Sequence, residues 1–94
     1  MSERVKKVIW TPTAKKKLNS ILSYRYAKIP SAWEIVENDI ISTSRNIVFS
    51  EQYQKDDIYP TYRKIIVRDY KILYRHEEEV VFIVNIVCTR AGKN

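Results

Sequence analysis

The chain has 94 residues, a formal net charge of +6 and 45% apolar residues, with one glycine and three prolines. This length and composition are typical of one small folded domain and argue against disorder. No segment approaches the roughly 20 consecutive apolar residues of a membrane span, and the first residues lack the apolar segment of a signal peptide. We therefore expect one cytoplasmic domain over residues 1–94, without membrane contact.

The charge is unevenly distributed along the chain. Residues 1–30 carry eight basic side chains and one acidic one, residues 31–60 carry two and six, and residues 61–94 carry seven and four. A small basic protein with its charge in blocks is expected to meet RNA, DNA or an acidic protein partner. The run Lys15-Lys16-Lys17 is interpreted as the solvated side of a helix, because charge runs usually serve solubility.

The first predicted elements are a strand and a helix. The β-branched run Val5–Trp10 predicts a strand, which ends at Thr11-Pro12. Thr11 suits a helix N-cap and Pro12 suits the first helical position, so we expect a helix from there to about Lys28. Its apolar residues recur at helical spacing: Ala14, Leu18, Ile21, Leu22 and Ile29.

A second helix is predicted to begin at Ser31, after Pro30. The pattern Ser31-Ala32-Trp33-Glu34 is that of a capping box, in which the Ser31 hydroxyl and the Glu34 carboxylate satisfy backbone amides reciprocally. The apolar stripe of this helix comprises Trp33, Val36, Ile40, Ile41, Ile47 and Val48. Two amphipathic helices joined by a short link predict a hairpin whose apolar side packs on another layer.

Residues 50–61 have no consistent period and are predicted to form a loop. After this loop, alternation of period two predicts strands at Tyr62–Val67, Tyr70–His76 and Val80–Thr89. The order β-α-α-β-β-β predicts an α+β fold, with a helical hairpin packed on one face of an antiparallel sheet.

The turns between these strands decide which side chains share a face. A two-residue turn at Arg68-Asp69 pairs Val67 with Tyr70, Ile65 with Ile72 and Arg63 with Tyr74. The helices are then expected to cover the face that carries Ile65, Val67, Tyr70, Ile72 and Tyr74. The opposite, open face carries Lys64, Ile66, Lys71, Leu73 and Arg75. A three-residue turn at Glu77–Glu79 adds Phe82, Val84, Ile86 and Cys88 to the covered face, and Val81, Ile83, Asn85 and Val87 to the open face.

The candidate functional residues are cationic. One histidine, one cysteine and one glycine exclude a histidine-rich metal site and a glycine-rich phosphate loop, so no metal or cofactor is expected. His76 is interpreted as an exposed turn residue, Asp56-Asp57 as solvated acids and Cys88 as a small buried hydrophobe. The remaining set lies on or beside the last three strands: Arg63, Lys64, Arg68, Lys71, Arg75, Arg90 and Lys93. Such cations can hold a phosphate backbone or stabilise charge at a phosphoryl centre.

Three segments carry a resemblance to a known family: the opening Val8–Ala14 with Leu18, the segment Tyr62–Arg75, and the ending Val87–Arg90. In their order and spacing they resemble the RelE/ParE superfamily, the toxins of type II toxin–antitoxin systems, over almost the whole chain. The resemblance implies a helical hairpin on an antiparallel sheet, a cognate antitoxin as partner, plasmid stabilisation, and growth arrest when the toxin is free. A homodimer or a toxin–antitoxin hetero-oligomer would also agree with it.

The superfamily divides by target. RelE-like members cleave mRNA on the ribosome with basic residues on the sheet and a Tyr or His near the C-terminus, whereas ParE-like members inhibit DNA gyrase and lack that set. Lys71 and Arg90 match cations of the nuclease branch and are the catalytic candidates, but only Ala91-Gly92-Lys93-Asn94 follow Arg90. The strand Tyr70–Tyr74 and the ending Thr89-Arg90 favour the ParE-like branch.

The leading hypothesis is therefore a toxin that inhibits DNA gyrase without turning over a substrate. The residues expected to bind the target or a nucleic acid are Arg63, Lys64, Lys71, Arg75 and Arg90. A ribosome-dependent mRNA endoribonuclease and a non-toxic nucleic-acid-binding module are the alternatives. The structural alternative for Arg90 is a salt bridge to Glu34 or Glu37 on the second helix.

Overall fold

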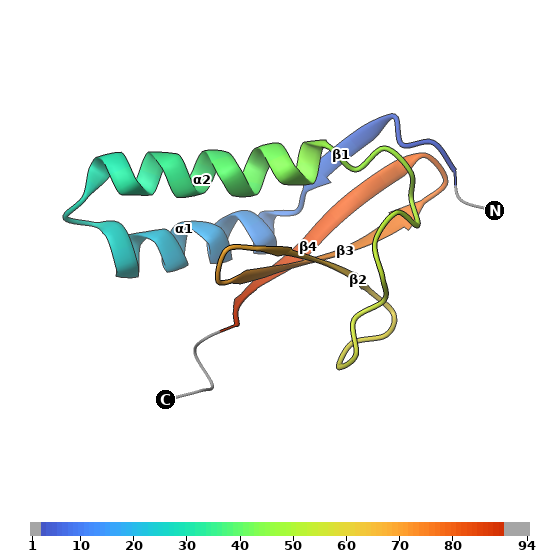
Figure 1. The fold of residues 1–94 in the computed structure, drawn as a ribbon. Coiled ribbons are helices and arrows are strands. Elements are labelled where there is room, and N and C mark those ends of the chain that lie inside the picture. The colour runs from blue at the N-terminus through green and yellow to red at the C-terminus, as the bar shows by residue number, and fades with distance from the viewer. Residues whose placement is uncertain (1–2, 90–94) are drawn as a thin grey trace.

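The computed structural model of the protein describes residues 3–89. Its elements are β1 (Lys7–Trp10), α1 (Pro12–Tyr26), α2 (Pro30–Arg45), β2 (Arg63–Val67), β3 (Tyr70–Glu77) and β4 (Val80–Cys88). The two helices lie side by side on one face of a four-stranded sheet, which confirms the predicted α+β fold (Figure 1). Within residues 3–89, neither helix has the length and apolar character needed to span a membrane.

The start of α1 depends on Thr11. Its hydroxyl accepts a hydrogen bond from the Ala14 amide (3.2 Å) and donates one to the Ile83 carbonyl (2.8 Å), so the N-cap also ties the helix to β4. The helix ends at Tyr26 rather than near Lys28, and Ile29 is consequently exposed in the link instead of belonging to the apolar stripe.

The start of α2 differs from the prediction. The helix begins at Pro30, with Ile29 in the N-cap position and no side-chain cap, so the predicted capping box of Ser31 and Glu34 is wrong. Proline favours the first helical position because its fixed φ is already helical and its missing amide is not needed there. Ser31 therefore lies inside the first turn, two positions past the N-cap, where its hydroxyl cannot act as the cap.

The sheet has the strand order β1-β4-β3-β2. β2, β3 and β4 are antiparallel, as predicted, and β1 adds to the edge of β4 in parallel. In the first hairpin Val67 lies opposite Tyr70 and Arg63 opposite Tyr74, which confirms the predicted register. Arg68 adopts a positive φ of 54° in the two-residue turn, a conformation that such a tight connection requires.

The second hairpin corrects two expectations. Glu77 pairs with Val80, so the turn has two residues rather than three, and a β-bulge places an extra residue, Val84, between the partners of Leu73 and Tyr74. Each difference shifts the alternation by one residue. Val81 and Ile83 are therefore buried under the helices, and the prediction that Phe82 and Val84 face the helices is wrong. Beyond the bulge the two shifts cancel, and Ile86 and Cys88 lie on the predicted side.

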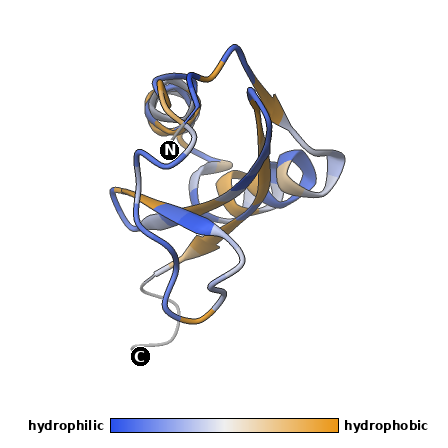
Figure 2. Ribbon diagram, turned by 90° about the vertical axis from the view of Figure 1, so that its right-hand side faces the viewer, coloured by the Kyte–Doolittle hydropathy of each residue, from blue (hydrophilic) through white to orange (hydrophobic). Residues whose placement is uncertain are grey.

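The core lies between the helical hairpin and the covered face of the sheet. Leu18 is 4% exposed within it, as predicted, and Trp33 packs against its margin in a partly buried position. The other residues at its centre are Ala14, Leu22, Val36, Ile40, Ile65, Tyr70, Ile72, Tyr74, Val81, Ile83 and Ile86. Figure 2 shows hydrophobic stretches along the sheet interrupted by hydrophilic ones, while the chain between α2 and β2 is hydrophilic over most of its length.

We expect Leu18→Ala to lower the free energy of unfolding by about 2–5 kcal/mol, because it removes buried methyl groups and leaves a cavity. Tyr24→Ala is the matched control on the same helix, since Tyr24 is 92% exposed, and it should change stability by less than about 0.5 kcal/mol. Urea unfolding followed by circular dichroism measures both, and equal effects would contradict this assignment of the helix faces.

Candidate functional site

Residues 50–62, called the strap below, connect α2 to β2 and wrap around the β2 edge of the sheet (Figure 1). The strap begins on the side of the helices, where the Tyr74 hydroxyl donates to the Ser50 carbonyl (3.0 Å) and Arg63 donates to the Tyr53 carbonyl (2.7 Å). A backbone hydrogen bond then joins the strap to β2, in which the Lys64 amide donates to the Gln54 carbonyl (3.0 Å). The strap is therefore an ordered part of the sheet edge, although its sequence has no period.

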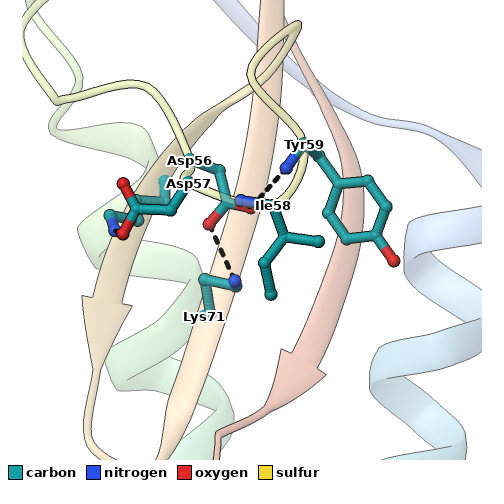
Figure 3. Close-up of polar contacts among 6 residues, drawn as sticks. Asp56, Asp57, Ile58, Tyr59 and Lys71 are labelled. Carbon is teal, nitrogen blue, oxygen red and sulfur yellow. Dashed lines mark hydrogen bonds and ion pairs between the residues drawn. The ribbon is translucent and has the colours of Figure 1, made fainter.

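On the open face the strap is fastened by a buried ion pair. The Lys71 Nζ lies 2.7 Å from Oδ1 of Asp56, whose side chain is fully buried, and the Lys71 side chain is 14% exposed. The other carboxylate oxygen of Asp56 accepts the amides of Ile58 (3.1 Å) and Tyr59 (2.8 Å), as Figure 3 shows. The interpretation of Asp56 as a solvated acid is therefore wrong, because the carboxylate closes a tight turn over Lys71.

Opposing effects act on the pKa of the Asp56 carboxyl group. Burial raises this pKa, because it disfavours the charged form, but the bond to Lys71 and the amides of Tyr59 and Ile58 stabilise the carboxylate. The attractive contacts prevail, and the pKa lies below its ordinary value. Asp56 is thus ionised near neutral pH and holds Lys71 as its partner.

The other predicted cations are also paired within the chain. Lys64 lies 3.4 Å from Asp57, whose side chain is 91% exposed, and Arg63 lies 3.6 Å from Glu51. The remaining contacts in this set are Arg75 with Glu77 (2.9 Å), Arg75 over the Phe82 ring (4.4 Å), and Arg68 with Asp39 (2.6 Å). Lys64, Lys71 and Arg75 share the open face, whereas the register places Arg63 on the other face beside Tyr74. Arg90 and Lys93 lie outside the described residues.

His76 and Cys88, the two remaining candidate side chains, are partly buried. His76 lies within β3 and is half-buried instead of standing in an exposed turn, and its Nδ1 has no hydrogen-bond partner among residues 3–89. Cys88 is partly buried against the core, with its Sγ 3.9 Å from an Arg25 nitrogen. Neither side chain forms an acid–base pair with a sheet cation in the described part of the chain.

A groove between β1 and the helical hairpin was not predicted from the sequence. It has a volume of about 460 Å³, and its floor includes Val8, Leu18 and Ile41. Its rim carries Lys15, Arg45 and the acidic Glu37, and none of the three forms an ion pair within residues 3–89. The signal for it in the sequence was weak, because the groove joins the edge of a short strand to two helices far apart along the chain.

The helical hairpin, the four-stranded mixed sheet and their order define a toxin fold of the RelE/ParE type. A structure described as "Chromosomal ParDE TA system from P. aeruginosa" superposes with a TM-score of 0.74 and 16% identity, covering 89% of this chain and 96% of that one. The toxin-antitoxin complex RelBE2 from Mycobacterium tuberculosis superposes with a TM-score of 0.53 and 18% identity, covering 92% and 98%.

The sequence itself matches, over residues 8–91, the family described as "ParE toxin of type II toxin-antitoxin system, parDE". The chain therefore belongs to the ParE toxin family. Comparison with curated protein sequences gives no match.

We expect Asp56→Asn to lower the free energy of unfolding at pH 7 by about 3–5 kcal/mol, because it leaves Lys71 buried without its counter-charge. Asp57→Asn is the matched control: it removes the adjacent carboxylate from an exposed pair, and should cost about 0–1 kcal/mol. Equal losses in the two variants, measured by urea unfolding, would contradict the structural role of the buried pair.

The same pair predicts a pH dependence. The folded-state pKa of Asp56 is lowered, so its stabilising contribution is complete above the unfolded-state pKa of about 3.9 and is lost as the pH falls through the folded-state value. The stability difference between wild type and Asp56→Asn should therefore shrink below about pH 4.

Proposed function

We propose that the chain is the toxin of a type II toxin–antitoxin pair, that it acts in the cytoplasm, and that it arrests growth by binding DNA gyrase without catalysis. Membership of the ParE family supports the first part. The proposal that the chain acts without catalysis is supported by the ion pair between Lys71 and Asp56. A nuclease mechanism would need Lys71 as a free cation, and here its charge is already engaged by a carboxylate.

The ion pairs on the open face of the sheet disfavour catalysis by its cations. A cation stabilises a phosphoryl transition state when it is aimed at the developing charge and is free of a competing anion. Lys71 already has a carboxylate at 2.7 Å, and Lys64 and Arg75 have Asp57 and Glu77 beside them. Any substrate phosphate would have to compete with a fully buried carboxylate of the same chain, so binding to a target protein is favoured over mRNA cleavage.

The groove between β1 and the helical hairpin supports an antitoxin partner that binds away from the open face. This groove has an apolar floor, and its rim carries two cations, Lys15 and Arg45, and one acid, Glu37, which is paired with neither of them in the described chain. An amphipathic segment with acidic residues would complement both features. We propose that the cognate antitoxin supplies this segment and is otherwise acidic and partly disordered, as is common for partners that fold on binding.

Gyrase inhibition is tested with purified full-length chain, gyrase and plasmid, in parallel with mRNA cleavage on translating ribosomes. We expect supercoiling to be inhibited and mRNA to stay intact.

Arg90→Ala should lose gyrase inhibition and growth arrest with an unchanged melting temperature. Arg90→Lys should lose much of the inhibition and much of the growth arrest, because an ammonium cannot reproduce the bidentate bonds of a guanidinium.

Cleavage at codon edges would overturn the proposal in favour of the endoribonuclease, and harmless overexpression would favour a non-toxic nucleic-acid-binding module. A fully inhibitory and normally folded Arg90→Ala would remove Arg90 from the target-binding surface. Loss of inhibition that parallels loss of stability would instead indicate the salt bridge to Glu34 or Glu37.

We expect co-expression with the neighbouring antitoxin gene to raise the yield of the chain. The double variant Lys15→Glu/Arg45→Glu should weaken antitoxin binding by about tenfold or more, because it reverses both rim charges. Lys28→Glu/Lys55→Glu makes the same change of net charge away from the groove and should bind nearly as wild type. Equal yields with and without the antitoxin, or equal weakening in the two double variants by titration calorimetry, would contradict this placement.

A further inference from the structure

Two adjoining hollows lie beyond the strap's ion pairs. The first, of about 200 Å³, is lined by Tyr59 and Tyr62 of the strap, with Leu73, Val84 and Asn85 from the sheet. Its position depends on the Asp56 turn, which holds Tyr59 by its amide, and the Tyr59 ring points away from the ion pair (Figure 3). Two tyrosine side chains thus line this hollow together with two apolar residues and one amide, and Tyr59 is half exposed.

The second hollow, of about 410 Å³, is lined by Lys16 and Lys17 of α1, together with Thr13, Ser20 and Asn85. Asn85 lines both hollows, so they adjoin at this residue, and the two together are called the track below. The track crosses β4 beyond Ile83, where the paired part of β1 has ended. The Asn85 Oδ1 accepts the Ile86 amide (2.8 Å), so its NH₂ group is the part of the side chain that a ligand can use.

The chemistry of the track differs from that of the sheet cations. Lys16 and Lys17 are exposed and have no ion pair within residues 3–89, unlike Lys64 and Lys71. Tyr62 also lines a third hollow that contains Lys55, Arg75 and Glu51, so cations lie on both sides of the tyrosines.

We propose that this track binds single-stranded nucleic acid, with an unstacked base against Tyr59 and Tyr62 and the adjoining phosphates at Lys16 and Lys17. Aromatic side chains beside exposed cations are the combination that holds single strands, because every base has a face that can stack. Lysine is depleted in the cores of protein interfaces but contacts phosphates well, which favours this ligand over an acidic protein. The inference does not depend on the gyrase proposal, since it uses neither Lys71 nor Arg90.

The test is fluorescence anisotropy of the full-length chain with labelled oligothymidylate and oligouridylate of about 12 nucleotides, a length within the range that single domains bind. Tyr59→Ala should weaken binding by about tenfold with little change in the salt dependence. Lys16→Ala/Lys17→Ala should weaken it and reduce the slope of log K against log salt by about 1.4, the value for two contacts to a single strand. Comparison of the two oligonucleotides identifies whether DNA or RNA is preferred.

Matched variants outside the track keep the proposal falsifiable. Tyr24→Ala removes an exposed tyrosine of α1, Lys7→Ala/Lys28→Ala removes two exposed lysines, and both should bind as wild type. The proposal is overturned by absence of binding at low salt, by equal losses in track and control variants, or by tighter binding of duplex DNA. It is also overturned if polyglutamate of matched charge binds as well and with the same dependence on Tyr59, which would indicate an acidic protein. Circular dichroism confirms that each variant is folded.

Discussion

The arrangement of the open sheet face depends on one buried ion pair. Asp56 lies in a segment without regular structure, yet its carboxylate binds Lys71 and the amides of Ile58 and Tyr59 at once. A carboxylate that loses its water is stable only when such contacts replace it, so the strap has little freedom to take another path. The pair therefore positions the strap, determines which cations are engaged, and presents Ile58 and Tyr59 toward solvent.

The elements that follow a regular period could be predicted from the sequence. The alternation in β2 and β3 gave the correct register and placed Tyr70 and Tyr74 under the helices, because a two-residue turn leaves only one pairing. Alternation alone gave no signal for the bulge at Val84, since an extra residue in one strand depends on twist and packing against the helices. The predicted face of Phe82 was wrong because the turn before it has two residues rather than three, and that of Val84 because Val84 is the extra residue of the bulge.

The candidate site was less predictable than the fold. Its cations were found because basic residues recur on and beside the strands, but most of their partners come from elsewhere in the chain. Glu51, Asp56 and Asp57 come from the strap and Asp39 from α2, whereas Arg75 pairs with Glu77 of its own strand. A loop without period indicates nothing about which acid will be buried and which will stay in water. Asp56 and Asp57 are adjacent in sequence, yet one is fully buried and the other is 91% exposed, a difference that arises only when the strap wraps around β2.

The ion pairs within the chain also determine which surfaces keep the positive potential of its net charge of +6. The cations of the sheet are largely neutralised by the acidic middle third of the chain, whereas Lys15, Lys16, Lys17 and Arg45 have no ion pair within residues 3–89. The positive field is therefore expected to be strongest along α1 and near the end of α2. Acidic partners would be drawn first to the helices, on either side of which lie the groove at β1 and the track at β4.

A shared fold cannot by itself assign a target, because both a ParDE and a RelBE2 structure superpose on this chain. What distinguishes chains that share this fold must therefore come from their side chains. Here a single acidic residue supplied by the strap turns a sheet lysine from a free charge into a structural contact. Since the strap is a connection outside the regular elements, a change in its sequence would alter the chemistry of the face while the helices and strands keep their arrangement, and loss of Asp56 itself would also lower stability.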